Sequence, residues 1–163
     1  MQFYEDIEIG TRLELGSYQF QLDEIKIFAA KFDPQPFHLD EEAAAKGLYG
    51  RICASGWHTA SIGMKLLVAA RKKQREDMQS QGIPVAKTGP SPGFENLKWL
   101  KPVYPGDTMT AAMEVTGKRV LATRPEWGMV FNHYAAHNQN GDLVYCYDAK
   151  SLVERRVPAG QSA

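Results

Sequence analysis

The chain has 163 residues, enough for one domain with a hydrophobic core. Hydrophobic residues make up 44% and charged residues 23%, and the formal net charge is +0, which excludes the excess charge of a nucleic-acid binder. The two cysteines, Cys53 and Cys146, form neither a disulfide framework nor a metal-ligand spacing. Residues 1–8 lack the regions of a secretory signal, and the longest apolar run, residues 66–70, is too short to span a bilayer. We therefore expect a cytoplasmic protein that binds neither nucleic acid nor membrane.

The first half of the chain is predicted to contain one strand and several helices. Residues 12–20 have the pattern of a strand whose apolar residues change face at Gly16, which predicts a β-bulge. An apolar stripe then predicts a short helix that ends at Phe32, and residues 40–46 are predicted to form another helical segment. A long helix is expected to begin at Ser55, because serine is a favoured N-cap. Apolar side chains lie nearly all around residues 57–70, so we expect this part of the helix to be buried, and we expect its charged last turns, residues 71–81, to emerge into solvent.

The second half is predicted to form an antiparallel sheet. Residues 82–93 are rich in proline and glycine and are predicted to be a loop. Strand patterns follow, most clearly the alternation of apolar and polar side chains over residues 108–116, and Asn140-Gly141 predicts a hairpin between the last two strands. The predicted fold class is α+β, with an antiparallel sheet wrapped around one long helix. We expect a single domain over residues 1–163, with its core at about 7–153.

The candidate catalytic pair is Asp33 and His38, which lie in the segment FDPQPFHLD at residues 32–40. Each proline fixes its own φ and disfavours helical space for the residue before it, so we expect this segment to be extended and not helical. A carboxylate and an imidazole on a rigid loop are suited to proton transfer. The alternative is an ordinary turn without catalytic function, in which Asp33 caps the turn and His38 packs against its neighbours.

The start of the long helix is the candidate anion site. Backbone N–H groups in a first helical turn have no intrahelical partner and favour negative charge. Gly56 allows a ligand close to the backbone, so its N–H could stabilise a thioester enolate as an oxyanion hole does. The alternative is a serine-capped helix without a ligand. Ser61 could line a pocket or bond a backbone carbonyl, and we expect His58 and Cys53 to be structural.

No metal site is predicted. His133 and His137 are four residues apart in a predicted strand, which places them on one face but about 13 Å apart. That separation is too large for two ligands of the same ion.

Together, these segments resemble the MaoC-like dehydratase family, which includes the (R)-specific enoyl-CoA hydratases. The resemblance rests on FAAKFDPQPFHLD at residues 28–40, on ASG at residues 54–56 and on KPVYPGDT at residues 101–108. It implies a hotdog fold, and a homodimer or dimer of dimers. It also implies that Asp33 and His38 are the catalytic pair.

The resemblance places the start of the long helix opposite this pair. Gly56 would bind the thioester oxygen, and Ser55, Trp57 and Ser61 are the candidate substrate-binding residues. The chain departs from the family pattern at two positions: Gln35 stands where asparagine is usual, and Ser55 stands where histidine is frequent.

The predicted function is that of an acyl-CoA hydratase or dehydratase, which adds water reversibly to a 2-enoyl-CoA and gives a 3-hydroxyacyl-CoA. This chemistry requires neither a metal nor a redox cofactor. One alternative is an acyl-CoA thioesterase, which is disfavoured because residues 57–70 of the helix contain no carboxylate. Another is an acyl-CoA-binding hotdog domain without turnover, for which the departures at Gln35 and Ser55 leave room.

Overall fold

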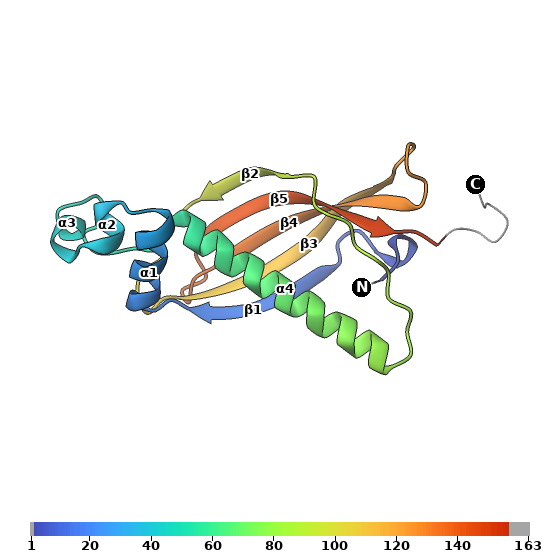
Figure 1. Cartoon of the computed structure of the whole chain (residues 1–163), viewed down its shortest axis with the longest axis horizontal. Coiled ribbons are helices and arrows are strands. Elements are labelled where there is room, and N and C mark those ends of the chain that lie inside the picture. Colours follow the sequence, from blue (N-terminus) through green and yellow to red (C-terminus); the bar gives the residue numbers. More distant parts are fainter. Residues whose placement is uncertain (1, 157–163) are drawn as a thin grey trace.

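A five-stranded antiparallel sheet curves around one long helix, α4 (Gly56–Ser80), in the computed structural model of the protein (Figure 1). The structure describes residues 2–156, so Met1 and residues 157–163 of the predicted domain lie outside the described residues. The sheet has the strand order β1-β3-β4-β5-β2. The strands are β1 (Arg12–Gln19), β2 (Phe94–Trp99), β3 (Thr108–Val120), β4 (Trp127–His137) and β5 (Leu143–Glu154). The predicted α+β class is confirmed.

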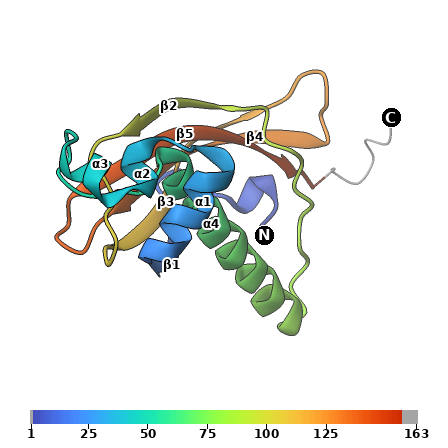
Figure 2. The same cartoon turned by 60° about the vertical axis from the view of Figure 1, so that its left-hand side comes forward.

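Three short helices lie at the end of the molecule where α4 begins (Figures 1 and 2). They are α1 (Leu22–Phe32), α2 (Pro36–Leu39) and α3 (Glu41–Ala45), and a 3-10 turn, η1 (Tyr4–Asp6), precedes β1. From the far end of α4, residues 82–93 run back to β2 as the predicted loop. Among the described residues, no helix is long and apolar enough to cross a membrane.

The predicted bulge in β1 is present. The register between β1 and β3 shifts between Glu14 and Gly16, and Gly16 has a φ of 107°, a conformation that glycine adopts without strain. Leu15 is the extra residue at the bulge, and the shift allows it and Phe20, after the strand, to be buried in the same core. The β1 strand can therefore bend around α4 without exposing its apolar side chains.

The alternation in β3 is also confirmed, because its apolar side chains face the core under α4. The buried set is Met109, Ala111, Met113 and Val115. The strand begins after a tight turn in which Gly106 has a φ of 88° and the Asp107 carboxylate accepts a hydrogen bond from the Tyr104 N–H at 2.8 Å. This turn joins β2 to β3 and brings the chain past the first turn of α4, where the Ala54 N–H donates to the Val103 carbonyl at 2.7 Å.

Helix α4 begins where the sequence predicts, but it is not buried on all sides. The Ser55 hydroxyl accepts from the Trp57 N–H at 3.2 Å, which is an N-cap bond. Within a single chain, however, Trp57, Met64 and Val68 remain 52%, 49% and 60% exposed. The expectation that residues 57–70 are buried on most faces is wrong for a single chain, because the sheet covers only one side of the helix and leaves an apolar stripe uncovered.

The segment around Pro36 is the second correction. Residues 36–39 form one helical turn, α2, although we expected the whole segment to be extended. Pro36 occupies the first helical position, where its missing N–H removes no bond and its fixed φ suits the helix. Gln35 before it is extended, as its place before a proline requires. The apolar stripe of α1 is also incomplete, since Phe32 is 70% exposed.

Candidate functional site

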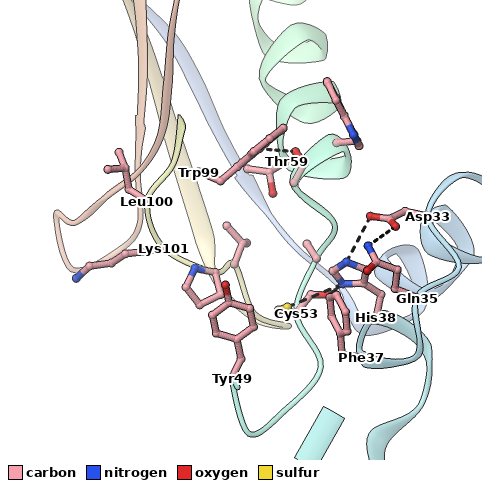
Figure 3. A pocket seen from close by; sticks show the side chains of 15 residues that line it. Asp33, Gln35, Phe37, His38, Tyr49, Cys53, Thr59, Trp99, Leu100 and Lys101 are labelled. Atoms are coloured by element: carbon pink, nitrogen blue, oxygen red, sulfur yellow. Dashed lines mark hydrogen bonds and ion pairs between the residues drawn. The ribbon is translucent and has the colours of Figure 1, made fainter. Parts of the chain in front are cut away.

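Asp33 and His38 lie beside the first turn of α4, on one wall of a cavity of about 350 Å³ (Figure 3). Asp33 ends α1 and His38 is on α2, so the helical turn at Pro36 brings the two side chains together. Gly56 also lines the cavity, while Trp99 and Lys101 form the opposite wall. The candidate pair and the candidate anion site therefore face the same space.

The position of His38 defines which ring nitrogen can accept a proton. Its Nδ1 lies 2.7 Å from the Cys53 carbonyl oxygen, which can only accept, so Nδ1 carries the hydrogen. In the neutral ring, Nε2 then has a free lone pair, and this atom lies 3.4 Å from Asp33 Oδ2. The His38 ring is buried. The backbone thus fixes both the tautomer and the orientation of a potential base.

The Asp33 carboxylate is held by two further side chains. The Ser55 hydroxyl donates to Oδ2 at 2.6 Å, and Gln35 Nε2 donates to Oδ1 at 2.7 Å. Burial by itself raises the pKa of Asp33, but the hydrogen bonds from Ser55 and Gln35 and the nearby His38 outweigh it, so the pKa lies below its usual value. Asp33 is therefore a fixed, ionised carboxylate at neutral pH.

Gly56 is in contact with a tryptophan from the sheet. The Trp99 indole N–H donates to the Gly56 carbonyl at 2.9 Å, and a Cβ on residue 56 would lie 2.6 Å from Trp99 Cε2. The glycine therefore has a packing role in addition to the close approach that we predicted. Its N–H is in the first helical turn, where an intrahelical acceptor is absent by geometry.

Of the other residues singled out in the sequence, some lie at the cavity or contact Asp33, and others have purely structural contacts. Ser55 caps α4 and bonds Asp33, and Trp57 lines the cavity. Ser61 does not line the cavity. Its hydroxyl donates to the Trp57 carbonyl at 2.7 Å, which is the second of the two alternatives that the sequence left open. Cys53 is buried, and burial raises the pKa of its thiol, in line with a structural role. His58 is packed, stacked on Phe28 with ring centroids 4.6 Å apart.

Several lining residues were not predicted. Tyr49 and Thr59 flank the α4 start, and Trp99 and Lys101 come from the sheet side. Lys101 Nζ lies 2.7 Å from Asp142 Oδ1, so its ammonium group is paired with a carboxylate just before β5. The residues around Trp99 in the sequence do not indicate that it lies at this site, because its partner Gly56 is 43 residues away. A glycine in a first helical turn indicates a close approach, but it does not say which residue approaches.

The MaoC like domain family matches residues 6–129 of the chain. The protein belongs to the MaoC-like family. The match includes both Asp33 and His38 and the start of α4, and the observed architecture is the hotdog fold that the sequence resemblance implied.

Individual relatives agree with this family assignment. The structure is similar to that of a MaoC-like dehydratase from Rhodospirillum rubrum, with 38% identity, a TM-score of 0.82, and coverage of 96% of this chain and 99% of that one. The (R)-hydratase from A. caviae involved in PHA biosynthesis is 25% identical, with a TM-score of 0.62, and the coverage is 93% and 99%. The uncharacterized protein YdeM of Bacillus subtilis (strain 168) is 31% identical over 93% of this chain and 98% of its own length. The family is therefore one of hydratases and dehydratases.

Proposed function

We propose that this protein is a hydro-lyase that adds water reversibly to the 2,3-double bond of an enoyl-CoA thioester. The observation that carries the proposal is the pairing of the Asp33 carboxylate with the free Nε2 of His38 at 3.4 Å, in the same cavity as the Gly56 backbone. The family and its hydratase and dehydratase members support the reaction type. Coenzyme A as the thiol carrier rests on the resemblance to the (R)-specific enoyl-CoA hydratases.

In the proposed reaction, a water donates one hydrogen to Asp33 Oδ2 and the other to His38 Nε2, the ring nitrogen that lies 3.4 Å from that oxygen. The water oxygen forms a bond to C3 of the enoyl group as its proton passes to the base. The π electrons move to the thioester oxygen and give an enolate, which takes a proton at C2 from the His38 imidazolium and so regenerates the base. Ionised Asp33 stabilises the imidazolium that forms on His38, and such positioned acid–base catalysis contributes about 10² to 10⁴ in rate.

The enolate charge would be bound at the start of α4. The Gly56 N–H and the positive end of the helix dipole favour an oxyanion there, and removal of one such donor typically costs on the order of 10² to 10³ in rate. Trp57 and Trp99, whose rings meet edge to face at 5.2 Å, would border the acyl group or its pantetheine arm. Ser55 acts in this proposal by holding Asp33. Ser61 has no role at this cavity.

We further propose that the protein works as a homodimer. β2 is an edge strand of the sheet, and it exposes the apolar side chains of Phe94 and Trp99. The uncovered stripe of α4, which is formed by Trp57, Met64 and Val68, is the second apolar surface that a second copy would bury.

The proposed activity is tested by mixing the protein with crotonyl-CoA and longer enoyl thioesters and following the loss of the enoyl absorbance. Chiral analysis of the 3-hydroxyacyl product gives the stereochemistry. A free-thiol assay on saturated acyl-CoA runs in parallel, because thiol release without hydration would identify a thioesterase. Acyl-CoA binding without any product over long incubation would identify a binding domain and would refute the hydro-lyase.

A further inference from the structure

A second cavity lies at the other end of the chain's long helix. It has a volume of about 540 Å³ and is bordered by α4, by the returning loop at residues 82–93 and by the inner face of β4 and β5. Arg71 is 15 positions after Gly56 on α4, which corresponds to about 22 Å at the helical rise of ~1.5 Å per residue. The two cavities share no lining residue. This cavity is therefore separate from the site of Asp33 and His38.

Positive charge dominates the lining of this cavity. Three cationic side chains of α4, Arg71, Lys72 and Arg75, border it, and no carboxylate of the described residues does. Glu76 lies 3.8 Å from Lys72 but outside the lining. Hydroxyl groups complete the polar part of the wall, from Thr88, Ser91, Tyr134 and Ser151. These groups can all donate hydrogen bonds to an anion.

Arg71 is the central charge. Its guanidinium is partly buried and donates to two neutral acceptors, Gln74 Oε1 and Met113 Sδ, both at 3.2 Å. These two residues line a smaller cavity of about 100 Å³, which Arg71 borders as well. Within residues 2–156, it forms no ion pair with a carboxylate. A partly buried charge without a counter-ion destabilises the folded chain. An anionic ligand would remove that penalty.

The wall around Arg71 is fixed before any ligand arrives. The loop is tied to β5 by the Gly89 N–H, which donates to the Leu152 carbonyl at 3.0 Å, and by a β-bridge between Thr88 and Val153. Tyr134 borders the same cavity as Arg71. Burial raises the pKa of its phenol, and the positive charge of Arg71 opposes that rise. A preformed cavity loses less conformational entropy on binding than one that must order a loop.

The remaining lining of the cavity is apolar. Leu67 and Val68 border it one turn before Arg71 and Lys72 on the same helix, so an apolar surface adjoins the charges. The planar fork of an arginine matches the two oxygens of a carboxylate. We propose that this cavity binds a carboxylate that carries an apolar chain, with Arg71 as its main anion ligand and Leu67 against the chain.

The test measures binding and thermal stability with octanoate, acetate and inorganic phosphate as probes. We expect octanoate to bind more tightly than acetate or phosphate and to raise Tm. The Arg71→Met variant should weaken octanoate binding by roughly 10- to 100-fold, because a hydrogen bond to a charged group typically contributes that much to affinity. Lys73→Met also removes one positive charge, two residues further along α4 and outside the cavity, and it should leave octanoate binding unchanged.

Two further readouts separate a binding role from a structural one. Without ligand, Arg71→Met should raise Tm, because it removes an unpaired charge and keeps an apolar stem. Arg71→Lys, which keeps the charge but loses the fork, should bind octanoate between wild type and Arg71→Met. Equal binding of the three probes, equal losses in Arg71→Met and Lys73→Met, or a lower Tm of ligand-free Arg71→Met would each overturn the proposal. None of these measurements requires turnover, so their outcome is independent of the hydro-lyase assignment.

Discussion

At the scale of single residues, the two departures from the family pattern, Gln35 and Ser55, both contact the Asp33 carboxylate. Gln35 and Ser55 each donate a hydrogen bond to a different oxygen of Asp33, at 2.7 and 2.6 Å. Both substitutions therefore act on the same carboxylate, and they keep it ionised and in one orientation. This role indicates why the two changes are compatible with activity in the proposed reaction.

The first prediction concerns Gln35→Leu, which keeps the side-chain volume but removes the donor. Because the Gln35 bond lowers the pKa of Asp33, its loss should raise that pKa, so the part of the acid limb of kcat/KM that is due to protonation of Asp33 should move to higher pH. At neutral pH we expect a loss on the order of 10-fold from a less well oriented carboxylate. The pH profile of enoyl-CoA hydration measures both effects.

The matched control for this prediction is Gln139→Leu. Gln139 Nε2 donates to Asp107 Oδ1 at 2.8 Å, so it makes the same type of bond in the turn before β3. This control should leave the pH profile unchanged. An acid limb that stays in place in Gln35→Leu would show that the glutamine does not control Asp33.

At the scale of secondary-structure elements, the packing of β2 on α4 depends on Gly56. A Cβ at this position would lie 2.6 Å from the Trp99 ring, so Gly56→Ala should displace Trp99 and cost about 1–3 kcal/mol in the free energy of unfolding. The N–H of residue 56 is kept in this variant, so a loss of activity would arise from the displaced tryptophan. Denaturant unfolding and kcat/KM measure the two effects.

A double-mutant cycle tests the cause. In a Trp99→Leu background, Gly56→Ala should cost less than in wild type, because the ring that it meets is gone. An equal cost in both backgrounds would show that the glycine is needed for the backbone and not for Trp99.

The packing of α1 on α4 depends on His58, which gives a pH prediction for stability. Burial lowers the pKa of His58 below 6.5, and Glu24 partly opposes this shift. The unfolded chain therefore takes up this proton near pH 6.5 while the folded chain resists it, so stability is full above pH 6.5 and declines as pH falls toward the folded pKa.

His58→Phe keeps the ring stack on Phe28 and removes the titrating group. The free energy of unfolding of this variant should therefore depend less on pH than that of wild type between about pH 7 and pH 5. Urea unfolding at a series of pH values measures the slope. Parallel slopes in the two proteins would mean that His58 is already free to take up a proton in the folded state.

At the scale of the whole molecule, local patterns predicted most of the fold. The N-cap at Ser55, the bulge at Gly16 and the alternation of β3 depend on neighbours in the sequence, and all are confirmed. The turn at Pro36 was missed because two prolines were interpreted as helix breakers, although proline is favourable at a first helical position. Trp99 was missed because its contact with Gly56 forms only in the folded chain.

The exposed stripe on α4 leads to a prediction about assembly. The apolar pattern around this helix predicted burial, and one chain does not bury Trp57, Met64 and Val68. If a second copy covers the stripe, Met64→Asp places an unpaired charge in the interface and should raise the dimer dissociation constant by roughly 10² or more. Light scattering coupled to size-exclusion chromatography measures the mass of each protein.

Lys65→Asp, on the neighbouring face of α4 over the Tyr18 ring, is the control and should leave the dimer intact. A wild-type protein that is monomeric at micromolar concentration would contradict the proposed assembly. The same conclusion would follow if Met64→Asp had the mass of the wild-type dimer.

The central claim is that Asp33 and His38 perform the proton transfer of hydration, and their substitution tests it most directly. The chain offers a matched control, because His133 Nδ1 and Asp148 Oδ1 form a similar pair at 2.6 Å on the opposite face of the sheet. In the enoyl-CoA hydration assay, Asp33→Asn and His38→Gln should each lower kcat/KM by about 10² to 10⁴. Asp148→Asn and His133→Gln should remain close to wild type. Undiminished turnover in both Asp33→Asn and His38→Gln would contradict the account.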